Sequence, residues 1–512
     1  MKILSAPQMR ELDRLTVEIN NETSHELMLR AAAAFCEAFC KRWDEDTPVT
    51  IFAGPGNNGG DALAVAKMLT EIGYEVTTFL FNPKQNLSPD CATCRQQLLN
   101  TPGHHFTEIT DKFDPPALHE EIVVIDGLFG TGLNKPLTGG FASLTKFINA
   151  SPSTVVSIDM PSGLMSENNQ EYSADAIVRA DYTFTFQYPK LALMLDGYAP
   201  YYGKVSVLNI GLLESVAQSM PTPYQTIEFD TVFQIVQPRK PNSHKGTFGT
   251  ALLIAGQQGM AGAATLAAKA CLRSGVGKVA VHTAANNNDI LQISTPEAIV
   301  LSDKNATHIT TMPADLTKYT GIGIGPGIGT HPDTAEALQH ILRSASSPLV
   351  VDADALNLLA QNRHLLSLLP KNSILTPHPG ELQRIAGTTT SPENLLQKAI
   401  QLSTTSQTFV ILKGHHTAIC TPAGEVYFNT TGNAGMATAG AGDVLTGILT
   451  SFLAQGYSPL HTCILGVYLH GLAGDKAEQR LGQHALIASD IILHLHDAFR
   501  ECCSSTSYTP FL

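Results

Sequence analysis

Hydrophobic residues follow two alternating patterns along this chain. Short apolar runs rich in Val and Ile, such as T-V-V-S-I at 154–158 and F-V-I-L at 409–412, are typical of buried strands. Between such runs, segments such as A-L-A-V-A-K-M-L at 62–69 place apolar residues at the spacing of one helix face. Because strands that alternate with helices build parallel sheets with helices on their faces, the pattern predicts an α/β fold.

The length of the chain indicates more than one domain. At 512 residues it exceeds the size at which a single hydrophobic core usually stops growing. Four prolines between residues 221 and 241 interrupt the regular alternation, which is typical of a domain boundary. We therefore expect a first domain at residues 1–215, a linker at 216–235 and a second domain at 236–500.

Charge and cysteine content restrict the partners and the compartment. Lys and Arg total 32 against 45 Asp and Glu, so the formal net charge is −13. This acidic balance argues against a nucleic-acid or anionic-membrane surface, and no apolar run is long enough to span a bilayer. Nine cysteines without a regular framework fit a reducing compartment. We expect a cytoplasmic protein with no nucleic-acid partner and no membrane contact.

A glycine-rich turn joins the first predicted strand to a helix. It reads G-P-G-N-N-G-G-D at 54–61, which formally satisfies the dinucleotide fingerprint G-x-G-x-x-G. The next strand ends on Asn82 where that fingerprint asks for an acidic residue, so an ordinary Rossmann dehydrogenase is disfavoured. Asn57, Asn58 and Asp61 bring side-chain oxygens into the turn, which points to a ligand or a hard cation.

Two later strands end on aspartates. Asp126 opens into G-L-F-G-T-G-L-N-K-P, and Asp159 opens into M-P-S-G-L. The carboxyl ends of parallel strands share one edge of a sheet, where ligands bind. We therefore expect Asn58, Asp126, Asp159 and Ser162 to converge on a site.

A second glycine-rich loop, at 432–447, leads into a predicted helix. It reads G-N-A-G-M-A-T-A-G-A-G-D-V-L-T-G. Gly440 and Gly442 permit close backbone approach, and the first-turn amides of the helix have no intrahelical partner, so the loop suits a phosphate. Asp443 at the helix start either caps the helix or takes a proton from a hydroxyl beside that phosphate.

Other strand ends of the second half carry further polar groups. They present Asp352 or Asp354, His378 with Glu381, and Lys413, while G-I-G-I-G-P-G-I-G at 321–329 forms a glycine-rich loop. No P-loop Lys-Ser/Thr motif occurs, so a P-loop nucleotide hydrolase is excluded.

Three motifs of the first half together resemble the YjeF N-terminal family of NAD(P)H-hydrate epimerase domains. They are G-P-G-N-N-G-G-D, D-G-L-F-G-T-G-L and S-I-D-M-P-S-G-L. The resemblance implies a Rossmann-like three-layer α/β/α domain, a potassium ion held by Asn58, Asp126 and Ser162, and Asp159 as the substrate-contacting acid/base group. The implied substrate-binding residues are Asn57, Asn58, Gly59, Gly60, Asp61, Gly130, Thr131, Gly132, Leu133, Asn134, Lys135 and Pro136.

The second half resembles the ribokinase-like superfamily, whose signature is the G-A-G-D at 440–443. With T-P-H-P-G-E at 376–381 and G-M-A-G-A-A at 259–264, it is most similar to the ADP-dependent NAD(P)H-hydrate dehydratases. The resemblance implies a ribokinase-like α/β domain with ADP as phosphoryl donor and Mg²⁺ placed through water by Glu381. The implied adenine-nucleotide residues are Lys413, Gly414, His415, His416, Thr417 and Gly442, and those facing the hydrated cofactor are Ala263, Gly327, His378 and Asp443.

Together the two resemblances imply an enzyme that repairs hydrated NADH and NADPH. The first domain would interconvert the R and S epimers, and the second would use ADP to dehydrate the S form, giving AMP and phosphate. Asp443 would deprotonate the ring hydroxyl so that phosphorylation turns it into a leaving group. We also expect a homo-oligomer. Two alternatives stay open: a ribokinase-like small-molecule kinase with an accessory nucleotide-binding module, and a non-enzymatic nucleotide-sensing or protein-binding module.

Overall fold

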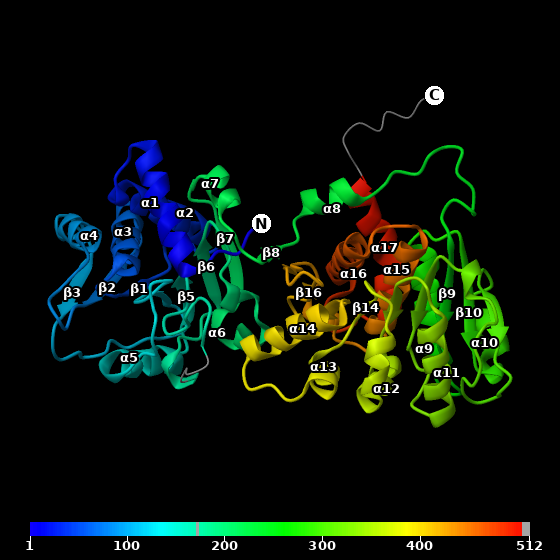
Figure 1. The fold of residues 1–512 in the computed structure, drawn as a ribbon. Helices are drawn as coiled ribbons and strands as arrows, with labels where there is room; N and C mark the ends of the chain where they lie inside the picture. The colour runs from blue at the N-terminus through cyan, green and yellow to red at the C-terminus, as the bar shows by residue number, and fades with distance from the viewer. Residues whose placement is uncertain (170–173, 504–512) are drawn as a thin grey trace. The chain divides into compact units, whose positions relative to one another are not determined.

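The computed structural model describes residues 1–169 and 174–503 and contains two compact units, each with its own sheet (Figure 1). The first unit is Met1–Thr222 with Ser391–Glu393, and the second is Pro223–Thr390 with Asn394–Leu512. Within residues 216–235, the structure places the end of helix α7, strand β8 and helix α8. The stretch expected as a linker therefore contains folded elements that belong to both units.

The sheet of the first unit has seven strands in the order β3-β2-β1-β4-β5-β6-β7. Every neighbouring pair in it is parallel. The order reverses between β1 and β4, as in Rossmann-like folds, so the predicted fold class is confirmed for this half. The strands are β1 Val49–Ala53, β2 Val76–Phe81, β3 His105–Ile109, β4 Val123–Gly127, β5 Thr154–Ile158, β6 Tyr182–Phe186 and β7 Lys204–Leu208.

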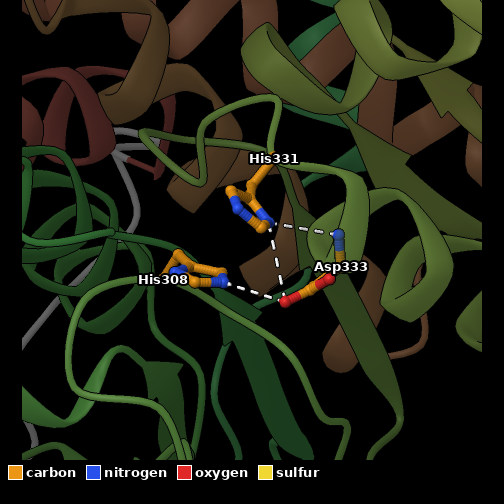
Figure 2. A group of neighbouring side chains, drawn as sticks. All are labelled: His308, His331 and Asp333. Carbon is orange, nitrogen blue, oxygen red and sulfur yellow. Dashed lines mark hydrogen bonds and ion pairs between the residues drawn. The ribbon is translucent and has the colours of Figure 1, made fainter.

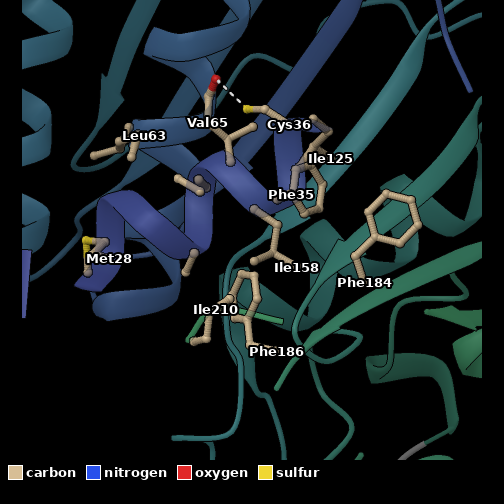
Figure 3. Packing of buried hydrophobic residues seen from close by; sticks show 14 of the residues in the cluster. Met28, Phe35, Cys36, Leu63, Val65, Ile125, Ile158, Phe184, Phe186 and Ile210 are labelled. Atoms are coloured by element: carbon tan, nitrogen blue, oxygen red, sulfur yellow. Dashed lines mark hydrogen bonds between the residues drawn. The ribbon is translucent and has the colours of Figure 1, made fainter. Parts of the chain in front are cut away.

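Helices cover both faces of this sheet because its strands are apolar on both sides. Val123 and Ile125 of β4 pack in one core with the helices α1 to α4, whereas Val124 packs in a second core with α5. In the first core the ring of Phe35 meets that of Phe184 edge-on at 5.3 Å, among the side chains drawn in Figure 3. The helices are α1 Ala6–Asn20, α2 Ser24–Cys40, α3 Asn57–Glu71, α4 Pro89–Leu99, α5 Gly139–Ala150, α6 Ala199–Tyr202 and α7 Glu214–Ser219.

The second unit has a ten-stranded sheet in the order β11-β10-β9-β12-β13-β14-β15-β16-β17-β8. Pairing is parallel except at β15/β16 and β16/β17, and the order reverses between β9 and β12. The strands are β8 Tyr224–Thr226, β9 Thr250–Ile254, β10 Lys278–Thr283, β11 Ile299–Ser302, β12 Gly321–Ile324, β13 Leu349–Val351, β14 Ile374–Leu375, β15 Phe409–Leu412, β16 Ala418–Cys420 and β17 Val426–Phe428.

Close packing of two helices brings the predicted phosphate loop onto the second sheet. A Cβ atom on Gly447 of α15 would lie 2.2 Å from the backbone oxygen of Ala267 on α9, so α15 approaches that small-residue helix directly. The helices are α8 Phe229–Ile235, α9 Ala261–Arg273, α10 Asn288–Ser294, α11 Pro332–Ser344, α12 Ala353–Gln361, α13 Pro379–Ala386, α14 Pro392–Ser406, α15 Ala441–Ala454, α16 Pro459–Leu481 and α17 Ala488–Cys503. Across the described residues, none of the helices is long and apolar enough to cross a membrane.

Candidate active sites

The glycine turn of the first unit lies at the point where its strand order reverses. A Cβ atom on Gly59 would lie 1.7 Å from the backbone oxygen of Gly54, and one on Gly54 would lie 1.9 Å from that of Leu128. Only glycine permits this close approach. The turn therefore holds Asn57 and Asn58, the first residues of α3, beside the loop that follows β4.

Asp159 is the acid of this site that pairs with a buried lysine. It follows β5 with a left-handed φ of 64°, which is uncommon for a residue other than glycine. Its Oδ1 accepts hydrogen bonds from the ammonium of Lys190 at 2.5 Å and from the Thr185 hydroxyl at 3.2 Å. The amide of Thr131 donates to Oδ2 at 3.4 Å. The carboxylate is therefore tied on one side to a buried cation and on the other to the loop after β4.

Neighbouring charges and burial shift the pKa values of the acids of this site in opposite directions. Burial works to raise the pKa of Asp159, but the Lys190 ammonium and its hydrogen bond outweigh burial, and the pKa is lowered. Burial and the Asp159 charge raise the pKa of Asp13, on α1, to about 6, and the same two causes raise the pKa of Asp61 well above its usual value. Neighbouring acids whose pKa values are shifted in opposite directions are typical of acid/base sites.

Lys190 and Asp13 were missed by the sequence analysis. Lys190 follows β6 in the run Q-Y-P-K, so its position after a strand of the parallel sheet was the available signal. Asp13 sits within an ordinary amphipathic helix and gives no such signal, because only the fold brings α1 to the strand ends.

Asn58 and Gly130, both predicted substrate residues, meet beside Asp159. A Cβ atom on Gly130 would lie 2.7 Å from Oδ1 of Asn58 and 3.3 Å from Oδ2 of Asp159. The side-chain nitrogen of Asn58 is buried and has no hydrogen-bond partner among the described residues. Buried amide nitrogens without a hydrogen-bond partner are rare in proteins, so we expect a ligand to supply the missing polar partner.

Asp126 and Ser162, two of the residues predicted to bind a metal ion, are hydrogen-bonded to each other. Asp126 is fully buried, and its Oδ1 accepts from the Ser162 hydroxyl at 2.5 Å and from the Leu128 amide at 3.3 Å. Its Oδ2 accepts from the Ser162 amide and from the Ser157 hydroxyl, both at 2.8 Å. Four donors occupy about as many lone-pair positions as a carboxylate has, so Asp126 positions Ser162.

A cavity of about 450 Å³ opens beside the loop after β4. It is lined by Thr131, Gly132, Leu133, Asn134, Lys135 and Pro136, all of them predicted substrate residues. Arg10 of α1 also lines it and adds a second cation to that of Lys135. The 57–61 turn and Gly130 are not among its lining residues, but Thr131 both lines the cavity and donates to Asp159.

In the second unit, the half-buried Lys413 pairs with the buried Asp352 at the strand ends. Lys413 follows β15 and its ammonium donates to Oδ1 of Asp352 at 2.9 Å, while the Thr446 hydroxyl of α15 donates to Oδ2 at 2.7 Å. Burial works to lower the pKa of Lys413, but the carboxylates of Asp352 and Glu381 outweigh burial and the pKa is raised. Lys413 is therefore a fixed positive charge.

Asp443 lies in the first turn of α15, whose N-cap Gly440 has a φ of 92°. Burial and the Asp352 charge raise the pKa of Asp443 to about 7, although Lys413 opposes this. The adjacent Gly442 is close to the ion pair, because a Cβ atom on it would lie 3.5 Å from Nζ of Lys413 and 3.7 Å from Oδ2 of Asp352. A carboxyl group with a pKa near neutrality is suited to a general base.

A cavity of about 580 Å³ opens beside this helix start. Of the predicted nucleotide residues, Lys413, Gly414, His415, Thr417 and Gly442 line it, and His416 does not. Residues that the sequence analysis missed also line it, including Asn433, His470 and Gly471. Burial lowers the pKa of His470 to about 4, so this imidazole is neutral, and its Nε2 is buried with no hydrogen-bond partner among the described residues.

The predicted hydrated-cofactor residues fall into two groups. Gly327 has a φ of 59°, and a Cβ atom on it would lie 3.1 Å from that of Ala263, so these two are neighbours. His378 is the N-cap of α13, and its Nδ1 accepts from the amides of Gly380 and Glu381. Glu381 in turn lies 3.9 Å from Nζ of Lys413, which links His378 to the ion pair.

Fold and geometry define an α/β enzyme with two separate sites. Each site lies at the ends of strands of a largely parallel sheet, and each holds an acid with a shifted pKa beside a lysine that pairs with a buried aspartate.

Comparison with known proteins names the family. The sequence profile described as NAD(P)H-hydrate dehydratase matches residues 251–495, and that of the YjeF-related protein N-terminus matches residues 24–192. The bifunctional NAD(P)H-hydrate repair enzymes Nnr of Moorella thermoacetica and Coxiella burnetii are each 34% identical to this chain; the alignments cover 96% and 95% of it and 95% and 97% of the relatives. The chain belongs to this family of bifunctional NAD(P)H-hydrate repair enzymes, so both resemblances drawn from the motifs are confirmed.

A solved structure gives a further likeness. The ADP/ATP-dependent NAD(P)H-hydrate dehydratase of Bacillus subtilis, co-crystallized with ATP/Mg²⁺, is 31% identical, covers 54% of this chain and 98% of its own, and superposes with a TM-score of 0.48.

Proposed function

We propose that this chain repairs hydrated NADH and NADPH with two separate sites. The first unit interconverts the R and S epimers of the hydrated dinucleotide. The second dehydrates the S epimer with ADP as phosphoryl donor and releases AMP and phosphate. The observation that carries the proposal is Asp443, an acid with a pKa of about 7 beside the glycine start of α15 and a 580 Å³ cavity.

The dehydration step follows from the groups around Asp443. Near neutral pH about half of these carboxyl groups are ionised, so Asp443 can take the proton of the ring hydroxyl. The first-turn amides of α15 lack intrahelical partners, and together with the Lys413 ammonium they stabilise the negative charge of the transferring phosphoryl group. Attack of the hydroxyl oxygen on the terminal phosphorus of ADP releases AMP. The phosphorylated oxygen then leaves as phosphate, expelled by the electron pair of the ring nitrogen, and loss of a proton from the adjacent ring carbon restores the dihydronicotinamide.

Nucleotide binding is assigned to the 580 Å³ cavity. Lys413, Gly414, His415, Thr417 and Gly442, which line it, are proposed to hold the adenine nucleotide, and His416 stands just outside the lining. The unpartnered Nε2 of His470 is an acceptor for a hydroxyl or an amino group of this nucleotide.

The hydrated ring is assigned to the other side of Asp443. Ala263 and Gly327 provide a close-packed wall without side-chain bulk. His378 lies at the start of α13 and is proposed to contact the hydrated dinucleotide there.

The acid cluster of the second unit fits a divalent cation. Burial raises the pKa of Asp443 most, followed by the charge of Asp352, and Asp354 adds to this effect. The ammonium of Lys413 opposes it. Carboxylates and water are the ligands that Mg²⁺ prefers, and Glu381 and Asp354 are the residues proposed to hold it. A bound Mg²⁺ would neutralise charge on the transferred phosphate.

Epimerisation is assigned to Asp159 with Lys190. Asp159 exchanges a proton with the hydrated nicotinamide, and Lys190 keeps this acid ionised before substrate binds. The loop Gly130–Pro136, with Lys135 and Arg10 on the cavity wall, provides positive charge for the diphosphate.

The turn of the first unit fits a potassium ion beside this acid. The side-chain nitrogen of Asn58 is buried without a partner, and rotating the amide group by 180° puts the amide oxygen at that position, where it can bind a cation. The Ser162 hydroxyl donates its hydrogen to Asp126 and keeps a lone pair for the same ion. Asp126 supplies the balancing negative charge through Ser162. The ion would orient the substrate beside Asp159. The proposal assigns Asn57, Gly59, Gly60 and Asp61 to the backbone cradle of the nucleotide.

The proposal also covers domain limits and cellular setting. It assigns residues 1–215 to the epimerase and 236–500 to the dehydratase, in a homo-oligomer of the cytoplasm. Nine free cysteines support a reducing compartment. Light scattering on the purified chain measures the oligomeric state.

A single assay tests both activities. The protein is incubated with acid-treated NADH, which contains both epimers of the hydrate, plus ADP and Mg²⁺, and the dihydronicotinamide absorbance is followed. Full recovery is expected. Recovery that stops at the S fraction would contradict the epimerase assignment, and a stable phosphorylated product would favour the kinase alternative.

A further inference from the structure

Two histidines and an aspartate meet on the second unit, outside the cavities described above. Nε2 of His308 lies 3.2 Å from Oδ2 of Asp333, and Nδ1 of His331 lies 3.6 Å from the same oxygen (Figure 2). One ligand atom from each of the three lies within 4.8 Å of the others. The three residues come from two segments: His308 from the loop after β11, and His331 and Asp333 from the start of α11.

Hydrogen bonds around His308 are compatible with a proton on its Nδ1. Oδ1 of Asn305 accepts the amides of Thr307 and His308, so this atom is the amide oxygen. When the Thr307 hydroxyl donates to the same oxygen, at 3.0 Å, it accepts from Nδ1 of His308, also at 3.0 Å. In the neutral imidazole Nε2 then has a lone pair, and it points at a carboxylate oxygen of Asp333.

Nδ1 of His331 lies at the same place, with its lone pair engaged by the start of α11. Its Nδ1 accepts the backbone amide of Asp333 at 3.2 Å as the N-cap of α11, so this nitrogen is not protonated in the neutral ring. A metal ion at this point would take over the lone pair of His331 from that amide, and it would lie between Nε2 of His308 and Oδ2 of Asp333.

The spacing of these atoms is that of ligands around one metal ion. Two ligands held about 2.1 Å from a metal at angles of about 90–110° lie about 3.0–3.4 Å apart, close to the two observed contacts. Two imidazoles with one carboxylate suit Zn²⁺ or Ni²⁺, with water completing the coordination. The Thr307 hydroxyl on Nδ1 of His308 is the kind of outer partner that orients a metal-bound histidine.

Both sides of the cluster are already held in place. Asp303 accepts the backbone amides of Asn305, Thr310 and Thr311, at 2.8 to 3.0 Å, and fixes the loop that carries His308. On the other side the first turn of α11 carries His331 and Asp333. The positive end of the helix dipole disfavours a cation there, and the Asp333 carboxylate offsets this effect. A metal ion would thus join two rigid segments.

We propose that His308, His331 and Asp333 form a binding site for a divalent late transition-metal ion such as Zn²⁺. The bound ion ties the loop after β11 to the start of α11. That helix follows directly on the glycine-rich loop that contains Gly327. The site is separate from the proposed Mg²⁺ site at Asp354 and Glu381 and does not depend on the proposed reaction.

Competition for Zn²⁺ tests the site on the full chain. Protein stripped with a chelator is titrated with ZnCl₂ against a chromogenic zinc indicator. We expect one equivalent of tight binding that weakens by at least about tenfold in His308→Gln and in Asp333→Asn. His340→Gln, an exposed histidine on the same α11, is the matched control and keeps wild-type affinity. Circular dichroism verifies that each variant is folded.

A second measurement uses the unaltered protein. Diethyl pyrocarbonate modifies accessible imidazoles, and mass spectrometry reports the rate for each histidine with and without ZnCl₂. Zinc is expected to protect His308 and His331 but not His340. Equal affinity in the ligand variants, absence of stoichiometric binding, or equal labelling with and without zinc would each overturn the proposal.

Discussion

The ammonium of Lys190 lies 2.5 Å from Oδ1 of Asp159, and both side chains are buried. Lys190 also donates to the Thr185 hydroxyl and to the Phe186 carbonyl, so all three of its N–H donors are used. The cation is thus held rigidly and keeps Asp159 ionised, and a substrate that displaces either contact would change the proton affinity of the acid. Removal of the Lys190 ammonium should therefore change both the rate and the pH dependence of epimerisation.

Replacing Lys190 by Met is expected to lower epimerisation by about 10²-fold or more near neutral pH. Without the ammonium, burial raises the pKa of Asp159, so the acidic limb of the pH–rate profile moves to higher pH. Epimer exchange, followed by chromatography of the two hydrates over a pH series, measures both effects. Lys146→Met, at an exposed lysine on α5, is the control. A lower rate with an unmoved limb would assign Lys190 a purely structural role.

Two substitutions should separate the two activities. Asp443→Asn is expected to reduce dehydration by about 10²-fold or more, because the general base is lost, and to leave epimerisation unchanged. Asp159→Asn should do the reverse. Each variant is assayed with ADP for dihydronicotinamide recovery and without ADP for epimer exchange. Loss of both activities from either change would refute the two-site arrangement.

The pH dependence of dehydration should follow Asp443. Because its pKa is about 7 and the ionised form is the base, kcat/KM should fall below about pH 7 and level off above it. Asp354 contributes to raising this pKa, so Asp354→Asn, assayed at saturating Mg²⁺ because Asp354 is also a proposed Mg²⁺ ligand, should move the limb to lower pH. Asp289→Asn, which changes an acid on α10, serves as the control. An unmoved limb in Asp354→Asn would show that another group titrates.

An added methyl group should have different effects at two glycines of α15, lowering activity at one and stability at the other. In Gly442→Ala the new Cβ has only ordinary contacts at 3.5 Å and beyond, so the fold should be kept while the phosphates are displaced, which costs up to about 10²-fold in activity. In Gly447→Ala it would lie 2.2 Å from the Ala267 backbone oxygen, so stability should fall by about 1–3 kcal/mol. Thermal melts and ADP-dependent kinetics distinguish the two effects. Equal activity in Gly442→Ala would argue against a phosphate at this helix start.

Much of the fold could be predicted because short-range chemistry dictates it. The alternation of apolar strands and amphipathic helices predicted two α/β halves, and the structure has a largely parallel sheet in each. Glycines such as Gly54 and Gly447 were visible in the sequence as breaks in the apolar pattern, but the backbone atoms that they approach belong to Leu128 and Ala267, which are distant in the chain. The stretch 216–235 read as irregular, although β8 within it pairs with β17, about 200 residues further on. Its partner lies too far along the chain for a local pattern to reveal.

By itself, the sequence determined the family, the strand ends that carry the chemistry and the acids Asp159 and Asp443, because motif glycines and terminal aspartates are local features. Only the tertiary structure decided how those acids ionise. A pKa depends on burial and on charges a few ångströms away, and Lys190, Asp352 and Lys413 reach their acids from the ends of other elements of the fold. The same holds for His308 and Asp333, which meet only because the loop after β11 folds beside the start of α11.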